Sequence, residues 1–459
     1  MMDRAVHRPL RAIASRLKRR FTTVARIVRE HGALGLLLIL GQRYLIRHLG
    51  SVLRHPAERR LKTLMAGRDP SKVLILKSTL DWAFPYRQRP HHLAQAVHEL
   101  GWSVVFVTRS AGYDLVPTVS KVRNGFFLTP FLDAALAVAD RPVVVLLSTD
   151  ADLDADLVAT LIRKDATIVY DFIDAFDEVV SSGKITERRR ALHDRLVAGD
   201  DFCVCTPSAD ILLSDVQRHR RRHFGLIENA VDTAHFRPGP GTLEGLRADF
   251  ARIVARGRPI AGYFGAFASW FDYELLAETA KRLPDVDFVL VGVNIDGTIS
   301  RLGQPPENVH IVRPIPYLDL PRHARWFSVG ILPFRLNGIT QATSPLKLFE
   351  YFSLGLPVVS TDLPECRKYE DAMIAADAAA FAAGIRDAIL HRRNAGAMAR
   401  RRRLAESDSS WRHRASRILA LAMEKRHSAE RTADPGPPVG AAIGAPRPVA
   451  VYEKIPARG

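Results

Sequence analysis

The sequence predicts an α/β protein with two doubly wound domains in tandem. Two series of short apolar runs, each interleaved with helix-like stretches, are the basis of this prediction. Short buried strands that alternate with helices form parallel sheets covered on both faces. The chain has 459 residues, of which 47% are hydrophobic, so it can build more than one core.

The first series predicts a Rossmann-like domain over residues 71–228. A helical stretch, residues 89–100, separates the first two runs. The predicted strands are residues 73–76, 104–107, 143–148, 167–172 and 202–207.

The second series predicts a Rossmann-like domain over residues 229–404, joined to the first near residues 228–240. Its clearest helix covers residues 273–283. The predicted strands are residues 260–265, 287–292, 309–312, 329–334 and 356–361. In folds of this type, ligands bind at the carboxyl ends of the strands, so a site is expected in a cleft between the two sheets.

The two ends differ in composition from the domains. Residues 405–426 are expected to contain a closing helix that begins near Trp411. The Pro-, Gly- and Ala-rich residues 427–459 are expected to be disordered.

Residues 1–70 form a basic extension with 16 Lys and Arg against 4 Asp and Glu, a net +12 out of the chain's +17. Apolar residues from Leu10 to Ile27 recur at helical spacing, which predicts an amphipathic helix on an anionic membrane surface. The apolar run 32–41 is about half the length needed to span a bilayer. The alternative is a basic helix packed on the protein itself. No nucleic-acid-binding motif accompanies the charge, so nucleic acid is not the expected partner.

Motifs for common cofactors are missing from the sequence. No Gly-x-Gly-x-x-Gly follows a predicted strand and no P-loop is present, which argues against hydride transfer and ATP hydrolysis. Gly262 and Gly265, at the end of one strand, would let the backbone approach a ligand closely.

The segment 342–361, ATSPLKLFEYFSLGLPVVST, predicts a helix capped by Ser344, with Pro345 first and Gly355 as its left-handed stop. The positive charge of Lys347 in the first turn is repelled by the positive amino end of the helix dipole. An anion bound at this end would offset the repulsion. With the hydroxyls of Thr343 and Ser344, Lys347 would bind a diphosphate, and Glu350 would accept hydrogen bonds from a ribose diol. The alternative is an exposed Lys–Glu pair.

This segment resembles the donor-binding helix of GT-B glycosyltransferases, particularly glycosyltransferase family 4. IENAVDTAHFRP (227–238) is similar to that family's interdomain segment, and residues 262–292 resemble the start of its second domain. Residues 81–94 and 169–174 are similar to a bacterial branch of the teichuronic acid and exopolysaccharide type. SSWRHRASRIL (409–419) resembles the closing helix, which in the family crosses back onto the first domain.

The resemblance implies a donor site made of Gly265, Thr343, Ser344, Lys347, Leu348 and Glu350. Glu350 matches the second glutamate of the family's Glu-x7-Glu pair, whereas Ala342 stands where the first is expected. The loop 266–272 also lacks the basic residue that the family commonly places beside the diphosphate. Lys347 is therefore the expected cation for the pyrophosphate.

The candidate residues on the first domain lie after a strand or at the start of a helix. Asp171 and Asp174 end a strand and would act as catalytic groups alongside Lys347, orienting or deprotonating an acceptor hydroxyl; a helix cap or ion pair is the alternative. Arg89 and His91 are expected to contact the acceptor or a phosphate, or else to be structural.

The resulting expectation is a hexosyltransferase that uses a nucleotide-diphosphate sugar as co-substrate and a lipid-linked or saccharide acceptor. The resemblance implies retention of configuration and no metal or other cofactor. Low cysteine content and the basic extension predict a cytoplasmic protein held at the inner face of the plasma membrane. The alternatives are a catalytically silent GT-B protein that binds sugar nucleotides, and a sugar-nucleotide epimerase.

Overall fold

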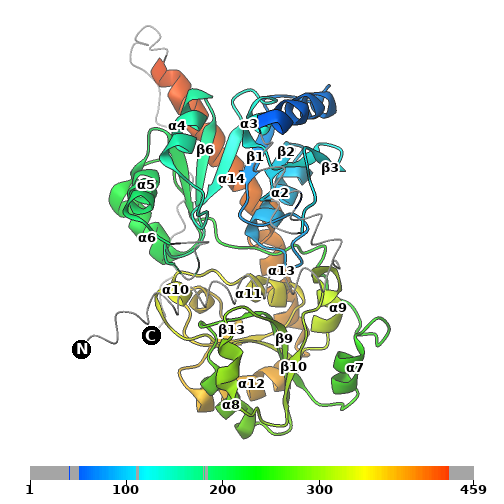
Figure 1. Ribbon diagram of the computed structural model, residues 1–459. Helices are drawn as coiled ribbons and strands as arrows, with labels where there is room; N and C mark the ends of the chain where they lie inside the picture. Colours follow the sequence, from blue (N-terminus) through cyan, green and yellow to red (C-terminus); the bar gives the residue numbers. More distant parts are fainter. Residues whose placement is uncertain (1–40, 42–50, 110–112, 179, 181–183, 434–459) are drawn as a thin grey trace, which may run out of the picture.

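The computed structural model describes residues 41, 51–109, 113–178, 180 and 184–433. The predicted membrane helix between Leu10 and Ile27 and the run up to residue 40 lie outside these residues, as does the predicted tail beyond residue 433. The described chain forms two lobes, one above the other in Figure 1, with α10 and α11 at their junction. The predicted class, two Rossmann-like α/β domains, is confirmed.

The first domain contains a seven-stranded sheet in the order β3-β4-β2-β1-β5-β6-β7. All neighbouring pairs are parallel except β3 and β4. The strands are β1 Val73–Lys77, β2 Ser103–Val107, β3 Ser120–Arg123, β4 Phe126–Thr129, β5 Val143–Leu147, β6 Thr167–Phe172 and β7 Cys203–Pro207. The prediction missed β3, a half-exposed edge strand without a continuous apolar run, and β4, which pairs with it.

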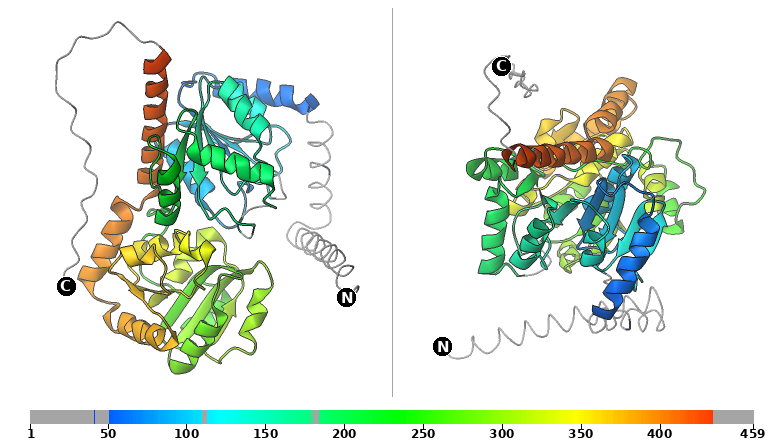
Figure 2. Two further views of the ribbon diagram at one scale, coloured as in Figure 1. Left: turned by 90° about the vertical axis from the view of Figure 1, so that its left-hand side faces the viewer. Right: turned by 90° about the horizontal axis from the view of Figure 1, so that it is seen from above.

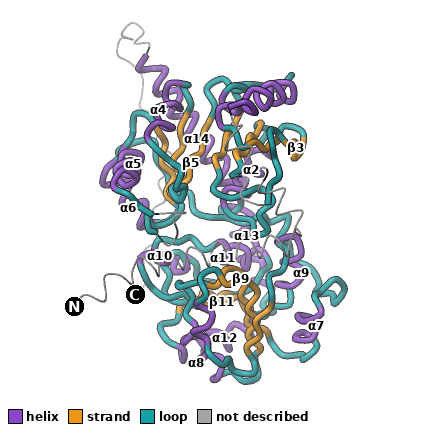
Figure 3. Tube along the Cα trace, in the orientation of Figure 1, coloured by secondary structure: helices purple, strands orange, loops and turns teal. Residues whose placement is uncertain are grey.

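Helices cover both faces of this sheet, as Figure 3 shows. They are α2 Arg89–Glu99, α3 Leu132–Leu136, α4 Ala155–Arg163, α5 Glu187–Ala198 and α6 Asp210–His219. Each follows a strand, so their amino ends lie at the carboxyl edge of the parallel strands.

Residues 51–65 form a helix that packs on the first domain. Its buried face consists of Ala57, Leu61 and Met65, which join the core beside β1, β2 and β5. A helix that buries apolar residues in the core is part of the domain. For residues 51–65, the structure therefore agrees with the alternative interpretation, in which the basic extension packs on the protein itself.

The second domain contains a six-stranded parallel sheet in the order β10-β9-β8-β11-β12-β13. The strands are β8 Ile260–Phe267, β9 Asp287–Asn294, β10 Val309–Val312, β11 Val329–Leu332, β12 Val358–Ser360 and β13 Ala372–Ile374. The edge strand β13 was not predicted, and only the first of its three residues is buried. The helices are α7 Ala248–Val254, α8 Tyr273–Arg282, α9 Leu320–Ala324, α10 Gly338–Gln341, α11 Leu346–Ser353, α12 Ala378–His391 and α13 Ala395–Ser407, with 3-10 turns η1 Thr298–Leu302, η2 Tyr317–Asp319 and η3 Cys366–Lys368.

The last helix, α14 (Trp411–Ala433), crosses from the second lobe and runs along the first, as the left view of Figure 2 shows. Trp411, Ile418 and Ala422 are buried in the same core cluster as Val97 of α2. The helix continues seven residues past residue 426, where the closing helix was predicted to end. In the part of the chain that the structure describes, no helix is long and apolar enough to cross a bilayer.

Candidate active site in the interdomain cleft

Helix α11 presents its amino end to the interdomain junction without a side-chain cap. Pro345 is its N-cap residue and, having no polar side chain, leaves the N–H groups of the first turn uncapped. The predicted cap, Ser344, lies one position too early. Its Oγ instead accepts a hydrogen bond from the Asn229 backbone N–H, at 3.1 Å. The amino end of α11 therefore remains available to an anion.

The carboxyl end of α11 stops as its sequence predicts. Gly355 has a φ of 79°, in the left-handed region. Its N–H bonds to the Phe352 carbonyl and the Leu356 N–H to the Tyr351 carbonyl, each at 2.9 Å. These two bonds make a Schellman ending, which fixes where the helix stops.

A cleft that is partly open to solvent lies between the two lobes at this helix. The second domain supplies Phe264, Gly265, Val291, Gly292, Pro314, Ile315, Tyr317, Leu320, Leu346, Lys347 and Glu350, and the first domain supplies Tyr86, Arg87 and Gln88.

Two glycines form the floor of the cleft where β8 and β9 end. Gly265 and Gly292 are opposite each other in the sheet. A Cβ on Gly292 would lie 1.7 Å from the Gly265 carbonyl oxygen, and one on Gly265 would lie 2.2 Å from Lys347 Cε. Glycine is thus required at both positions. Gly262, in contrast, makes room for the Phe327 ring, so it is a packing residue and not a ligand-approach residue.

Lys347 and Glu350 both line the cleft, and both have shifted pKa values. Loss of water around Lys347 lowers the pKa of its amine, although the charge of Glu350 opposes the shift. Burial raises the pKa of Glu350 to about 7, against the opposing effect of Lys347. Only 7% of Glu350 is exposed, so the alternative of a solvated surface pair is wrong. Lys347 Nζ also lies 5.5 Å from the centre of the Tyr263 ring.

Three other residues expected to bind the donor lie outside the cleft lining. Thr343 Oγ1 donates to the Ile339 carbonyl at 2.8 Å, and Ser344 bonds to the interdomain segment. The Leu348 side chain is fully buried in the second-domain core, because it projects from the side of α11 that faces the sheet. The Thr343 and Ser344 hydroxyls thus bond within the protein, and donor binding by Thr343, Ser344 and Leu348 stays a prediction.

Arg89 and Asp171 form a buried ion pair instead of an open catalytic or acceptor-binding pair. Arg89 Nε and Nη2 each lie 2.8 Å from an Asp171 oxygen, and Thr206 Oγ1 donates to the same carboxylate at 2.9 Å. Asp171 is fully buried and Arg89 is 3% exposed. Arg89 Nη1 donates to Asn229 Oδ1 at 3.1 Å, so the pair positions the segment that holds Ser344.

His91 also has a structural position. Its Nδ1 accepts from the Gln88 backbone N–H at 3.1 Å, and its Nε2 lies 2.9 Å from the Asp81 carbonyl oxygen. Burial lowers the pKa of His91 to about 4, so the ring is neutral at pH 7. His91 therefore fixes the loop before α2 and does not face an acceptor.

Asp174 remains a candidate acid or base. It is partly exposed just past the end of β6, and loss of water around it raises its pKa to about 7. The positive charge of Arg89 opposes this shift and the negative charge of Asp171 adds to it. A carboxyl group with a pKa near 7 can exchange a proton at neutral pH.

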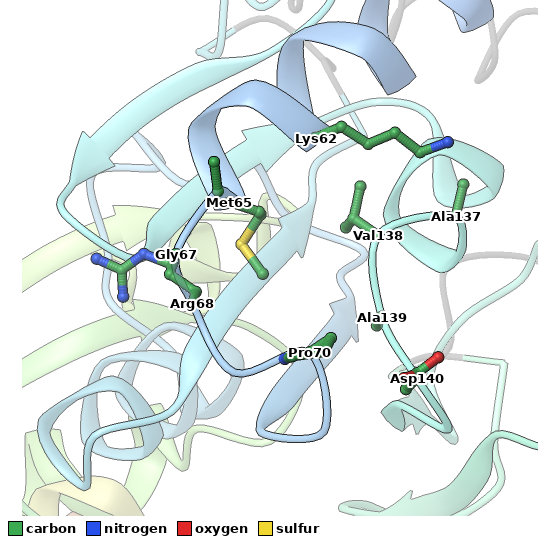
Figure 4. A pocket seen from close by; sticks show the side chains of 10 residues that line it. Lys62, Met65, Gly67, Arg68, Pro70, Ala137, Val138, Ala139 and Asp140 are labelled. Atoms are coloured by element: carbon green, nitrogen blue, oxygen red, sulfur yellow. The ribbon is translucent and has the colours of Figure 1, made fainter.

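A second hollow lies on the far side of the first domain, between the helix at 51–65 and residues 137–140 (Figure 4). Its lining includes Pro70 and Asp140, which precede β1 and β5, so it lies at the amino edge of the sheet. Ligands of doubly wound folds bind at the carboxyl edge. The cleft at α11 is therefore the functional candidate.

Sequence reasoning missed four polar residues of the cleft, namely Tyr86, Arg87, Gln88 and Tyr317. The Tyr317 hydroxyl is buried and bonds to no described residue. Arg87 lies in the same RQRPHH segment as Arg89 and could have been singled out with it. Tyr317 follows a short edge strand, and nothing in its sequence context distinguishes it.

Two Rossmann-like domains that face each other across a cleft, with an open helix end beside it, define the GT-B class of fold. Residues 258–391 match the family model described as Glycosyl transferases group 1. The resemblance to a GT-B glycosyltransferase that the sequence predicts is thereby confirmed for the second domain.

The chain is similar to a Bacillus subtilis (strain 168) protein provisionally named teichuronic acid biosynthesis glycosyltransferase TuaH. They share 28% identity over 217 residues, which is 44% of this chain and 52% of that protein. The chain thus matches about half the length of this curated relative.

Among solved structures, the N-terminal domain of Candida albicans trehalose-6-phosphate phosphatase aligns with a TM-score of 0.50 and 10% identity, over 77% of this chain and 96% of that one. Anabaena HepE, solved with UDP and glucose, aligns with a TM-score of 0.49 and 12% identity, over 79% and 99%. The first of these similarities supports the fold.

Proposed function

We propose that this protein is a glycosyltransferase that moves a hexose from a nucleotide-diphosphate sugar to a lipid-linked or saccharide acceptor in cell-surface polysaccharide biosynthesis. The observation that carries the proposal is the meeting of Lys347, Glu350 and the uncapped start of α11 over the glycine floor of the cleft. The family match in the second domain and the similarity to TuaH support the same activity.

The site would stabilise the departing nucleoside diphosphate. When the sugar C1–O bond breaks, negative charge develops on the diphosphate, and the Lys347 ammonium and the N–H groups of α11 would offset it. Because these groups supply positive charge at the leaving group, the proposed reaction needs no divalent metal.

Glu350 would hold the nucleotide through its ribose hydroxyls, and the narrow glycine floor would let the diphosphate approach the backbone. On the first domain, Asp174 would accept the proton of the attacking acceptor hydroxyl as the new glycosidic bond forms. Retention of configuration, as the resemblance implies, is part of the proposal.

The proposed place of work is the cytoplasmic face of a membrane, to which the basic residues 1–50 would bind. These residues carry 11 Lys and Arg against 2 Asp and Glu, a charge suited to anionic headgroups.

A thermal-shift screen of nucleotide sugars, followed by a transfer assay with the stabilising donor, tests the proposal, because a bound ligand raises the melting temperature. Lys347→Ala is expected to lower turnover by about 10²–10³-fold, similar to the loss of an oxyanion-stabilising donor. Lys281→Ala, an exposed lysine on α8, is the matched control. If no nucleotide sugar shifts the melting temperature, or if Lys347→Ala turns over normally, the proposal fails.

One observation favours a second candidate, a silent sugar-nucleotide-binding protein. Ala342, where the family has a sugar-handling glutamate, is 3% exposed and packs with the first-domain core. Donor binding without hydrolysis or transfer, for every donor tested, would establish this alternative.

A further inference from the structure

Arg87 faces the cleft from the first domain. It lies in the loop between β1 and α2, and it lines the cleft together with Gly265, Lys347 and Glu350 of the second domain. Arg87 on one lobe and the first turn of α11 on the other lobe thus line the same cleft.

The Arg87 guanidinium has no ionic partner in the described chain. Its Nη1 is buried and has no hydrogen-bond partner among the described residues. The group lies over the Trp82 ring, 4.3 Å from its centre. Burial lowers the pKa of Arg87, while the charge of Asp232 acts in the opposite direction without forming a hydrogen bond to it. A partly buried guanidinium with no carboxylate partner favours the binding of an anion.

The loop that carries Arg87 is held in place from several sides. The Asp114 carboxylate accepts hydrogen bonds from the backbone N–H groups of Trp82 and Ala83. His91 ties the Gln88 N–H to the Asp81 carbonyl. Because the loop is fixed at both ends, Arg87 is a preorganised cation, and its orientation does not depend on a flexible segment.

The second domain lacks a matching cation of its own. The loop 266–272 after β8 contains no Lys or Arg, so on this lobe Lys347 and the start of α11 carry the positive charge that lines the cleft. A nucleotide diphosphate carries more negative charge than one ammonium can offset.

We infer that Arg87 binds the diphosphate of the donor from across the cleft, as the second cation of the site. This inference rests on the proposed function and adds a residue of the first domain to the donor site. It also gives the donor a structural effect. A diphosphate held by Lys347 on one domain and Arg87 on the other links the two lobes.

Binding to the purified full-length protein tests the inference, with nucleoside diphosphate, inorganic pyrophosphate and the corresponding nucleoside measured by calorimetry. Arg87→Gln is expected to weaken both phosphate ligands by about 10- to 100-fold, the size of a lost charge-assisted hydrogen bond. Nucleoside affinity should stay unchanged. Arg195→Gln is the matched control, because Arg195 also lies over an aromatic ring, that of Phe202, but at an exposed position.

The outcomes separate this inference from the proposed function. Wild-type affinity of Arg87→Gln for both phosphate ligands would overturn the role of Arg87 and leave the donor site intact. If Arg87→Gln bound both phosphate ligands normally but bound a phosphate-containing acceptor more weakly, Arg87 would be an acceptor-binding residue, and the inference would also be overturned. If the wild-type protein bound none of the phosphate ligands, the donor site itself would be wrong. Melting temperatures of the variants confirm that each is folded.

Discussion

The side chain of Lys347 lies directly against the backbone of Gly265, so closely that a Cβ on the glycine would lie 2.2 Å from Lys347 Cε and 2.7 Å from its Nζ. Gly265 has a φ of 144°, a backbone conformation that residues with a side chain rarely adopt. The two residues come from β8 and α11. The position of the Lys347 ammonium therefore depends on the absence of a side chain at Gly265, in another element.

Gly265→Ala is expected to displace Lys347 and to lower turnover by about 10- to 100-fold, because leaving-group stabilisation depends on where the charge lies. Donor affinity should fall with it. Steady-state kinetics with a matched donor and acceptor would measure both. Gly297→Ala is the control, since Gly297 also has a positive φ but has open space around its Cβ position. Equal losses in the two variants would show that backbone strain, and not Lys347, is responsible.

The stability of the protein should fall between about pH 4.5 and pH 7 because of Glu350. Its pKa is about 7 in the folded protein, whereas the ordinary pKa of a glutamate, as in the unfolded chain, is 4.5, so the folded state holds the proton more tightly. This contribution is fully present below pH 4.5 and is lost as the pH rises to 7, by up to about 3 kcal/mol.

Urea unfolding of the wild type and Glu350→Gln at several pH values would isolate this effect. The free energy of unfolding of the wild type, relative to the variant, should decline up to pH 7 and then level off. Glu274→Gln changes a 77%-exposed side chain and should show a constant difference. A wild-type advantage that grows with pH would contradict the raised pKa.

Asp171 and Asp174 lie three residues apart. Neutralising Asp171 should lower folding stability, whereas neutralising Asp174 should lower turnover. Asp171→Asn leaves Arg89 buried without its counter-charge, and is expected to cost about 3–5 kcal/mol of folding stability. Asp174→Asn should keep the melting temperature and lower turnover by about 10²–10⁴-fold, the usual contribution of a general base.

Thermal unfolding and kinetics, measured on both variants, check this contrast. A stable but inactive Asp171→Asn would return the catalytic role to Asp171. The double variant Arg89→Met, Asp171→Leu should be more stable than Asp171→Asn, since it removes both buried charges.

Restoring the family's glutamate at position 342 is not expected to restore a sugar contact. Ala342 packs with the first-domain core, so Ala342→Glu would bury a carboxylate without a designed partner, at a cost of about 3–5 kcal/mol. Ala342→Ser, which adds one small polar atom, should cost much less. Chemical unfolding measures both. If Ala342→Glu kept full stability and bound donor more tightly, position 342 would face the sugar.

Membrane binding should depend on residues 1–50 and not on the helix at 51–65, which buries Ala57 and Leu61 in the first domain. Deletion of residues 1–50 is expected to abolish sedimentation with anionic vesicles, because each Lys or Arg near such a surface contributes about 1 kcal/mol. Deletion of residues 434–459, with 3 Lys and Arg against 2 Asp and Glu, should leave binding unchanged. Undiminished binding without residues 1–50 would refute the anchor.

By itself, the sequence determined the two doubly wound sheets and the stop of α11 at Gly355, and it singled out Lys347 and Glu350, which line the cleft. These features depend on local signals, namely apolar runs, a helix-ending glycine and charges out of place on an apolar helix. It missed β3 and β13, which are partly exposed strands at the sheet edges, and β4, which pairs with β3.

The tertiary structure decided which polar residues face the cleft. It paired Arg89 with Asp171 across 82 residues, placed His91 inside a capping interaction, turned Ser344 toward Asn229 and placed Arg87 in the same cleft as Lys347. Such assignments cannot be read from neighbouring residues, because the burial of a charge depends on which distant element lies against it. A buried charge is stable only with a partner, and folding chooses that partner.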